Sequence, residues 1–204
     1  MTEVVLTTER LDELFGNFPL RPGNVVWLVG GHQGLQVQFL WDTYPGISLD
    51  VYEPQIEWVE YLDDKFDEMP VRIHPYALGD RRGMLTAGLQ GMDCTFHWQH
   101  LKDAGLIEGP TKSLFMKDVV QEYVDSPTKP TLLMMNCEGS ELEIIKQLGV
   151  CDVLPLIPYV LTQFHSRVLG FEGCQEAYGI LEETHDIRWR YNEWAWVYAE
   201  VKEK

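Results

Sequence analysis

The sequence feature that most constrains the fold is an alternation between short, continuous apolar runs and segments with helical character. The first run, Val25 to Val29, is apolar throughout and is closed by Gly30 and Gly31. A continuous run, unlike one that alternates with polar residues, is typical of a strand covered on both faces, as in a parallel sheet. Because parallel strands need crossover connections, usually helices, the alternation predicts an α/β fold.

The same alternation continues to the end of the chain. Further strands are predicted at 47–52, 71–75, 84–89, 131–135 and 159–164, and helices at 35–41, 56–66, 116–124, 140–148 and 174–184. Residues 187–191 and 194–201 are predicted to form a final hairpin that turns at Asn192-Glu193. Ser113 is expected to lead into the 116–124 helix, and Ser140 and Gly149 to cap the 140–148 helix. The pattern predicts a Rossmann-like, doubly wound, mostly parallel sheet with helices on both faces and a C-terminal antiparallel β-hairpin.

The length of 204 residues fits a single domain, and no repeat or linker divides it. Residues 1–20 are expected to form an N-terminal helical extension. Residues 91–130 are the least regular part of the sequence and are interpreted as an insertion.

The charge balance excludes some function classes. The chain has 16 basic and 32 acidic residues, a formal charge of −16, and a pI near 4.6. Proteins that hold nucleic acid mainly through phosphate contacts need a basic surface, and anionic membranes attract basic segments. We therefore expect no nucleic-acid binding by the chain alone and no membrane partner.

Targeting and cysteine patterns favour a cytoplasmic location. The first ten residues lack the basic start and long apolar core of a signal peptide. The four cysteines, at positions 94, 137, 151 and 174, have no CxxC spacing. Such cysteines are expected to be reduced thiols rather than a disulfide framework.

Polar and glycine-rich segments follow the predicted strands, where ligands bind in doubly wound folds. The first is Gly30-Gly31-His32-Gln33-Gly34, whose glycines allow a tight turn and close approach to a ligand. It does not match GxGxxG and could be a plain strand-to-helix turn. Glu53, about 20 residues further on, is placed to bind ribose hydroxyls or to favour a helix N-terminus. Together, the loop and the acid predict an adenosine-type site.

Two later strand ends carry groups that can move protons. Asn136-Cys137-Glu138-Gly139-Ser140-Glu141 follows the 131–135 strand. Glu138 could act as a base or a hydrogen-bond acceptor, whereas Glu141 is interpreted as a first-turn helix acid and Cys137 as a buried thiol. His165, after the 159–164 strand, could take a proton from a substrate hydroxyl or could be a structural histidine.

The segment Cys94-Thr95-Phe96-His97-Trp98-Gln99-His100 spaces three potential zinc ligands at steps of three. Aromatic packing or substrate contact is the preferred interpretation, and no metal is expected. His97 is the candidate polar group on the substrate side of the site.

In order along the chain, these motifs resemble those of the FkbM-type methyltransferases, a branch of the class I S-adenosylmethionine-dependent enzymes. The matching segments are Leu28-Val29-Gly30-Gly31-His32-Gln33-Gly34, Glu53-Pro54, Ala77-Leu78-Gly79-Asp80 with Gly83, Asn136-Cys137-Glu138-Gly139-Ser140-Glu141, Gln163-Phe164-His165, and the tryptophan-containing strand 194–199. The resemblance covers about Val25 to Val201, and its most specific element is Glu-Gly-x-Glu.

The resemblance implies a cofactor and its binding residues. Gly30 and Gly34 would surround the methionine part of S-adenosylmethionine, Glu53 would bind the ribose, and Ala77 and Leu78 would lie near the adenine. Gly31, His32, Pro54 and Asn136 complete the expected cofactor site.

The resemblance also implies the reaction, which is methyl transfer in line to a hydroxyl of a small molecule or carbohydrate. His165 is the first candidate base and Glu138 the second, and the 91–130 insertion would shape the acceptor side. Three positions that are acidic in the family are neutral here, namely Leu28, Asn136 and Gln163. These changes leave open a non-catalytic module that binds the cofactor or a partner protein.

Overall fold

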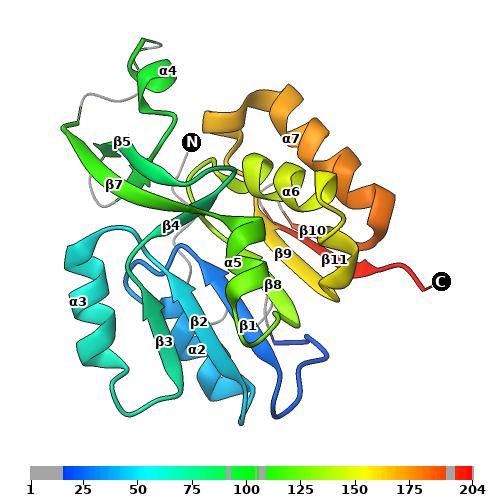
Figure 1. Cartoon of the computed structure of the whole chain (residues 1–204). Coiled ribbons are helices and arrows are strands. Elements are labelled where there is room, and N and C mark those ends of the chain that lie inside the picture. The colour runs from blue at the N-terminus through cyan, green and yellow to red at the C-terminus, as the bar shows by residue number, and fades with distance from the viewer. Residues whose placement is uncertain (1–15, 91–92, 104, 106–108, 192–195, 204) are drawn as a thin grey trace.

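The computed structural model describes residues 16–90, 93–103, 105, 109–191 and 196–203 (Figure 1). Its main sheet has seven strands in the order β10-β11-β9-β8-β1-β2-β3. Their bounds are β1 Val25–Val29, β2 Ser48–Tyr52, β3 Val71–His74, β8 Leu132–Met135, β9 Tyr159–Gln163, β10 His185–Tyr191 and β11 Trp196–Val201. β1, β2, β3, β8 and β9 pair in parallel, and β11 is antiparallel to both β9 and β10.

The strand order produces a switch point at the centre of the sheet. The chain starts at β1, proceeds outward to β3, crosses back to β8 beside β1, and proceeds outward again to β10. The connections after β1 and β8 therefore leave in opposite directions and open a crevice at the carboxyl ends of these strands.

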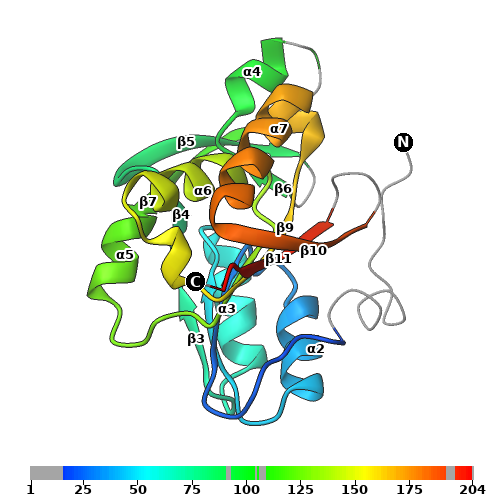
Figure 2. The same cartoon turned by 90° about the vertical axis from the view of Figure 1, so that its right-hand side faces the viewer.

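Helices cover both faces, which explains the continuous apolar strands. Val26 and Leu28 pack in one core with α2 (Leu35–Thr43) and α3 (Ile56–Lys65). Trp27 and Val29 point the other way, into a second core. The helices of that core are α5 (Val119–Asp125), α6 (Glu141–Val150) and α7 (Ser166–Thr184). Figure 2 shows α5 and α2 on opposite sides of the strands.

A second sheet lies above the carboxyl ends of the main strands in Figure 1. Its order is β4-β7-β5-β6, with the bounds β4 Ala77–Gly79, β5 Gly83–Gln90, β6 Asp93–Thr95 and β7 Thr111–Asp118. A short helix, α4 (Trp98–Asp103), follows β6. The segment 91–130 is thus more regular than its sequence suggests.

The helix predicted at 116–124 starts later, and Ser113 does not lead into it. Both Ser113 and Met116 lie in β7, which pairs antiparallel with β5 over six residue pairs. The backbone hydrogen bonds of this long-range pairing outweigh the local helical pattern, because β propensity depends mainly on tertiary context. Asp118 instead caps α5 by accepting a hydrogen bond from the Gln121 N–H at 2.9 Å.

Other element ends also differ from the prediction. Ser140 is at the N-cap position of α6 but makes no side-chain capping bond, and Gly149 lies inside that helix. α7 starts at Ser166 rather than 174 and contains a kink at Gly170, where φ is 68°. A short 3-10 helix, η1 (Leu154–Leu156), precedes β9.

The expected turn at Asn192-Glu193 lies outside the described residues. Of the N-terminal helix expected at 1–20, residues 1–15 also lie outside them, and residues 16–20 form no helix. No helix within the described ranges is long and apolar enough to cross a membrane. All four cysteines are among the described residues, and they form no disulfide.

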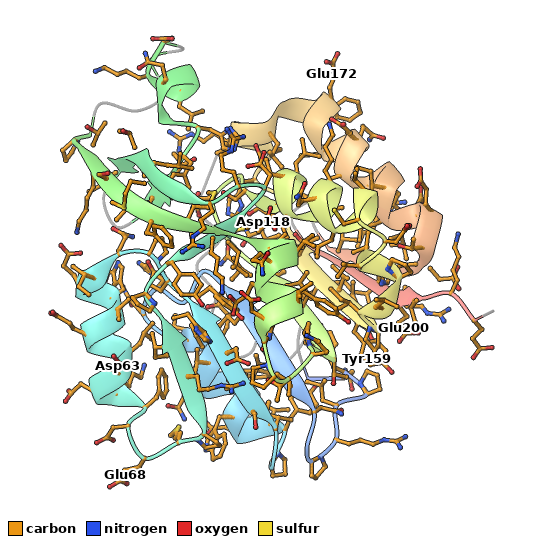
Figure 3. The ribbon with its side chains drawn as sticks, viewed as in Figure 1. Asp63, Glu68, Asp118, Tyr159, Glu172 and Glu200 are labelled. Atoms are coloured by element: carbon orange, nitrogen blue, oxygen red, sulfur yellow. The ribbon has the colours of Figure 1, made fainter. Side chains whose placement is uncertain are left out.

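The acidic residues labelled in Figure 3 indicate where part of the negative charge lies. Asp63, Glu68 and Glu172 point outward from the periphery of the molecule. Their position fits a solvated acidic exterior, which favours solubility.

Candidate functional site

The loops after β1 and β8 cross in contact at the switch point. Gly30 has φ 97°, and a Cβ atom built on it would lie 2.0 Å from the backbone oxygen of Asn136. The Gly30 N–H donates to the Tyr52 carbonyl at 2.9 Å, and the Asn136 N–H donates to the Val29 carbonyl at 2.9 Å. Only glycine fits at position 30, because a side chain would force the two loops apart.

These loops and β4 enclose a cavity of about 850 Å³, its open mouth included, which we call the first cavity. Eight residues singled out from the sequence line it, namely Gly30, His32, Glu53, Pro54, Ala77, Leu78, Asn136 and Glu138. Its lining mixes apolar side chains with a small number of polar groups, as is characteristic of small-molecule sites.

Glu53 is the buried carboxylate of the first cavity. It is only 4% exposed, and it accepts hydrogen bonds at 2.9 Å from the backbone N–H groups of His32 and Gln55. Burial raises the pKa of Glu53, although backbone hydrogen bonds from His32, Gln55 and Gly31 oppose the rise. No cationic side chain pairs with it in the described part of the chain, so the negative charge is stabilised by backbone N–H dipoles alone.

His32 lies beside Glu53 in the wall of the cavity. Its ring centroid is 4.6 Å from that of Trp58, and its φ is 42°. Burial lowers the pKa of His32, although the nearby charge of Glu138 opposes this shift. The lowered pKa favours the neutral imidazole. Its Nε2 atom is buried and has no hydrogen-bond partner among the described residues. Such an atom is expected to have a partner when the site is filled.

Gly31 and Gly34 do not line the first cavity. A Cβ on Gly31 would lie 2.6 Å from Val51 Cγ1, and one on Gly34 would lie 2.6 Å from Phe66 Cε2. Both glycines are therefore required by the packing of the loop against β2 and the end of α3. A role in direct cofactor contact stays a prediction for them.

Glu138, Glu141 and His165 form a hydrogen-bonded cluster next to the first cavity. His165 Nδ1 is 2.7 Å from Glu141 Oε1, and its Nε2 is 3.0 Å from Glu138 Oε1. Because carboxylates only accept hydrogen bonds, both ring nitrogens donate. Burial opposes the charged ring, but the two carboxylates raise the pKa of His165 well above its usual value. The ring is therefore held as an imidazolium.

Glu141 also organises the loop that carries Glu138. It is fully buried, and its carboxylate accepts hydrogen bonds at 3.0 Å from the N–H groups of Cys137 and Gly139. These bonds hold Glu138 in a left-handed conformation with φ 52°. Glu141 is a first-turn acid of α6, as predicted, and in addition fixes the loop. Cys137, which the sequence predicts to be buried, is half-buried and lines the first cavity, and desolvation raises the pKa of its thiol well above the ordinary value.

His97 lies at a second cavity rather than the first. This second cavity, about 690 Å³ with its mouth, lies between the second sheet and the start of α6. His97 Nε2 is 3.1 Å from Glu143 Oε1, and the hydrogen bond to Glu143 raises the pKa of His97 although burial lowers it. Phe96 and Ser140 line both cavities, so the cavities share a wall.

The three potential zinc ligands do not converge in the described residues. Cys94 lines the first cavity, whereas His97 pairs with Glu143 at the second cavity. The side chain of His100 lies outside what the structure describes. No group of three or more potential ligands forms a metal site among the described residues.

The three neutral positions have different environments. Leu28 is fully buried in the apolar core beside α2 and α3, where an acid would be costly. Gln163 pairs with Trp196 at the end of β9. Of the three, only Asn136 lines the first cavity.

Several cavity residues were not identified from the sequence. Tyr52, one position before Glu53, lines the first cavity, and its hydroxyl donates to Glu122 Oε1 at 3.2 Å. Glu122, on α5, also accepts from Tyr76 at 3.2 Å and pairs with Lys117. Tyr52 could have been found as the neighbour of a strand-end acid. Its partner in α5 could not, because the two are 70 residues apart.

No family model and no curated protein sequence matches the chain. Several solved structures are similar to it: a precorrin-6y C5,15-methyltransferase from Geobacter metallireducens GS-15 has a TM-score of 0.54 and 11% identity over 100% of this chain and 94% of that chain. A putative rRNA-methylase from Clostridium thermocellum has a TM-score of 0.53 and 10% identity, over 97% of this chain and 94% of that chain. A Methanococcus jannaschii fibrillarin pre-rRNA processing protein has a TM-score of 0.57 and 12% identity, over 92% of this chain and 70% of that chain.

At such low identity the similarity shows the fold alone. The mostly parallel sheet, its covering helices and the antiparallel β10–β11 hairpin confirm the predicted architecture, and the overall fold is similar to that of these structures. The chain therefore has the Rossmann-like methyltransferase fold.

Proposed function

We propose that this chain is an S-adenosylmethionine-dependent methyltransferase that methylates a hydroxyl group of a small molecule or carbohydrate. The observation that carries the proposal is Glu53. This carboxylate is buried at the end of β2, faces a cavity at the switch point, and has no cationic partner in the described residues. A ribose diol supplies two further O–H donors, which this carboxylate can accept in place of a cationic partner.

Other residues of the first cavity fit the remaining parts of an adenosyl ligand. Ala77 and Leu78, at 7% and 1% exposed, offer apolar surface for the adenine. His32 offers a buried ring nitrogen without a partner in the described chain, and Asn136 offers an amide beside Glu138. These groups bind and orient the cofactor, which supplies an electrophilic methyl group when bound.

In this proposal Glu138 accepts the proton of the acceptor hydroxyl, and His165 positions the Glu138 carboxylate. Glu138 lines the cavity, and His165 reaches its carboxylate with Nε2 at 3.0 Å. The sequence favours His165 as the base. However, both of its nitrogens donate to carboxylates here, so the ring has no lone pair free for a proton. Alignment of the acceptor and exclusion of water complete the contribution of the protein.

A non-catalytic binding module is the second candidate, favoured by the neutral Asn136 in the cavity wall. It predicts cofactor binding without turnover. An RNA acceptor, suggested by the rRNA-methylase among the similar structures, is disfavoured by the formal charge of −16.

Calorimetry with S-adenosylmethionine and S-adenosylhomocysteine tests cofactor binding. Glu53→Ala is expected to weaken binding about 30-fold or more, because hydrogen bonds to a charged group contribute roughly 1.5–3 kcal/mol each. Glu60→Ala, at an exposed position of α3, is the matched control and is expected to leave affinity unchanged. If the folded wild-type protein binds neither ligand, the proposal is wrong.

Transfer of a labelled methyl group to any acceptor separates the two candidates. Turnover that is lost in Glu138→Gln, with cofactor affinity retained, supports the methyltransferase. Cofactor binding without turnover on any acceptor supports the binding module.

A further inference from the structure

We propose that the second cavity binds the acceptor, and that the acceptor is a neutral, polyhydroxylated molecule of the size of a sugar ring. The inference rests on the proposed function, since it assigns the substrate side of the same site. Nothing in the fold alone requires an acceptor of this class.

The position of the second cavity suits an acceptor. It shares Phe96 and Ser140 with the first cavity, and the Ser140 side of the wall adjoins the loop that carries Glu138. The Glu138 carbonyl accepts a hydrogen bond from the Thr95 hydroxyl at 2.8 Å, which ties the end of β6 to this loop. Methyl transfer needs donor and acceptor atoms about 3 Å apart, so adjoining cavities are the required arrangement.

The charged groups of the second cavity are two internal ion pairs. Arg81 Nε lies 2.6 Å from Asp80 Oδ1, and His97 Nε2 lies 3.1 Å from Glu143 Oε1. With His97 protonated, as its raised pKa favours, the two positive and two negative charges cancel. An acceptor with a net charge would therefore gain little attraction. Hydroxyl groups both donate and accept, and so can bond to carboxylates and cations alike.

One of these carboxylates has an unused acceptor. Glu143 Oε2 is buried and has no hydrogen-bond partner among the described residues. An unpaired buried oxygen is unfavourable, and the last torsion of a glutamate side chain rotates easily. Because Glu143 lines the second cavity, rotation about this torsion allows its carboxylate to accept a hydrogen bond from a hydroxyl bound there.

The rest of the lining fits the apolar face of a sugar ring. Leu85 and Met116 come from the second sheet, and Phe96 adds an aromatic ring. Thr86 and Ser140 add hydroxyl groups. A mixture of apolar surface with a few fixed polar groups is characteristic of small-molecule sites.

Saturation-transfer NMR with a panel of methyl glycosides of common hexoses, 6-deoxyhexoses and pentoses tests the inference, with S-adenosylhomocysteine present. We expect at least one glycoside to bind. Glu143→Gln is expected to weaken that binding about tenfold, the loss of a charged hydrogen bond. His97→Gln, which breaks the same ion pair, is expected to weaken it in the same direction.

Glu176→Gln is the matched control, because Glu176 also forms an ion pair, with Lys146 at 2.5 Å, but lies on the surface of α7. It is expected to change neither glycoside nor S-adenosylhomocysteine affinity. Thermal unfolding of each variant establishes that it is folded.

The outcomes separate the two proposals. If S-adenosylhomocysteine does not bind, the proposed function fails whatever the glycosides do. If it binds but no glycoside does, or if glycoside binding is insensitive to both Glu143→Gln and His97→Gln, the inference is overturned. Glucose 6-phosphate or glucosamine binding at least tenfold more tightly than every neutral glycoside would also overturn it.

Discussion

The two buried glutamates of the site, Glu53 and Glu141, have similar burial but different partners. They are 4% and 0% exposed, and both accept hydrogen bonds from two or more backbone N–H groups. Glu141 has a cationic partner, His165, at 2.7 Å. Glu53 has none in the described residues, and it faces the first cavity.

The difference separates a structural carboxylate from a ligand-binding one. Glu141 is compensated within the protein, and removal of its charge would leave His165 and two N–H groups poorly paired. Burial raises the pKa of Glu53, so its charge is held at a free-energy cost that a donor from a ligand can offset.

The largest effect is expected at Gly30, where the loop after β1, which leads toward Glu53's side of the site, contacts the loop after β8, which leads to Glu141. Gly30→Ala combines a left-handed φ of 97° with a Cβ 2.0 Å from the Asn136 oxygen. We expect a loss of about 4 kcal/mol in the free energy of unfolding, or no folded protein. Gly23→Ala is the control, because Gly23 has φ 86° but open space around its Cβ position.

Denaturant unfolding of the two variants measures the difference. Gly23→Ala is expected to cost about 1 kcal/mol, the conformational part alone. Equal losses in both variants would contradict the close crossing of the loops.

Glu141→Gln is expected to lower the free energy of unfolding by about 3 kcal/mol, as for other broken buried ion pairs. Cofactor affinity should change less than tenfold, because Glu141 does not line the first cavity. Glu53→Ala should show the opposite profile, with a larger loss of affinity than of stability. Calorimetry measures the loss of cofactor affinity in both variants, and denaturant unfolding measures the loss of stability. Equal losses of both quantities in the two variants would contradict the distinction between Glu53 and Glu141.

The charge of His165 gives a pH dependence of stability. Its folded pKa is raised well above the ordinary value by Glu141 and Glu138, so its contribution is fully present below about pH 6.5. The contribution is lost as pH rises through the folded pKa. The difference in unfolding free energy between wild type and His165→Gln should therefore shrink as the pH is raised from 6 to alkaline values.

An NMR titration of the His165 ring checks the same point directly. In Glu141→Gln the pKa of His165 should fall toward its ordinary value. A wild-type His165 that titrates at or below pH 6.5 would contradict the imidazolium assignment.

The smallest effect is expected for an exposed ion pair that joins α6 to α7. Lys146 and Glu176 are 55% and 47% exposed, and their atoms approach to 2.5 Å. Lys146→Ala should leave the free energy of unfolding almost unchanged, because solvent screens exposed pairs. Denaturant unfolding of Lys146→Ala and Glu141→Gln compares the exposed Lys146–Glu176 pair with the buried His165–Glu141 pair. Equal losses of unfolding free energy would mean that burial does not distinguish the two pairs.

Local sequence was most informative where one residue pattern meets one local requirement. The continuous run Val25–Val29 predicts a strand buried on both faces, and the structure confirms it. Gly30 and Glu53 were found because they follow such strands. The prediction was wrong for 116–118, where Met116 lies in β7, because the partner strand β5 is about 30 residues away in the chain.

The sequence by itself determined the α/β architecture, the strand ends that meet at the switch point, and eight residues of the first cavity. These depend on local apolar runs and on the geometry of parallel strands. The tertiary structure alone decided which carboxylate is compensated. Three features depend on distances between segments far apart in the chain. They are the lack of a cationic partner for Glu53 among the described residues, the contact of His165 with Glu138 and Glu141, and the pairing of His97 with Glu143. Charge and burial act through such distances, and residue spacing does not encode them.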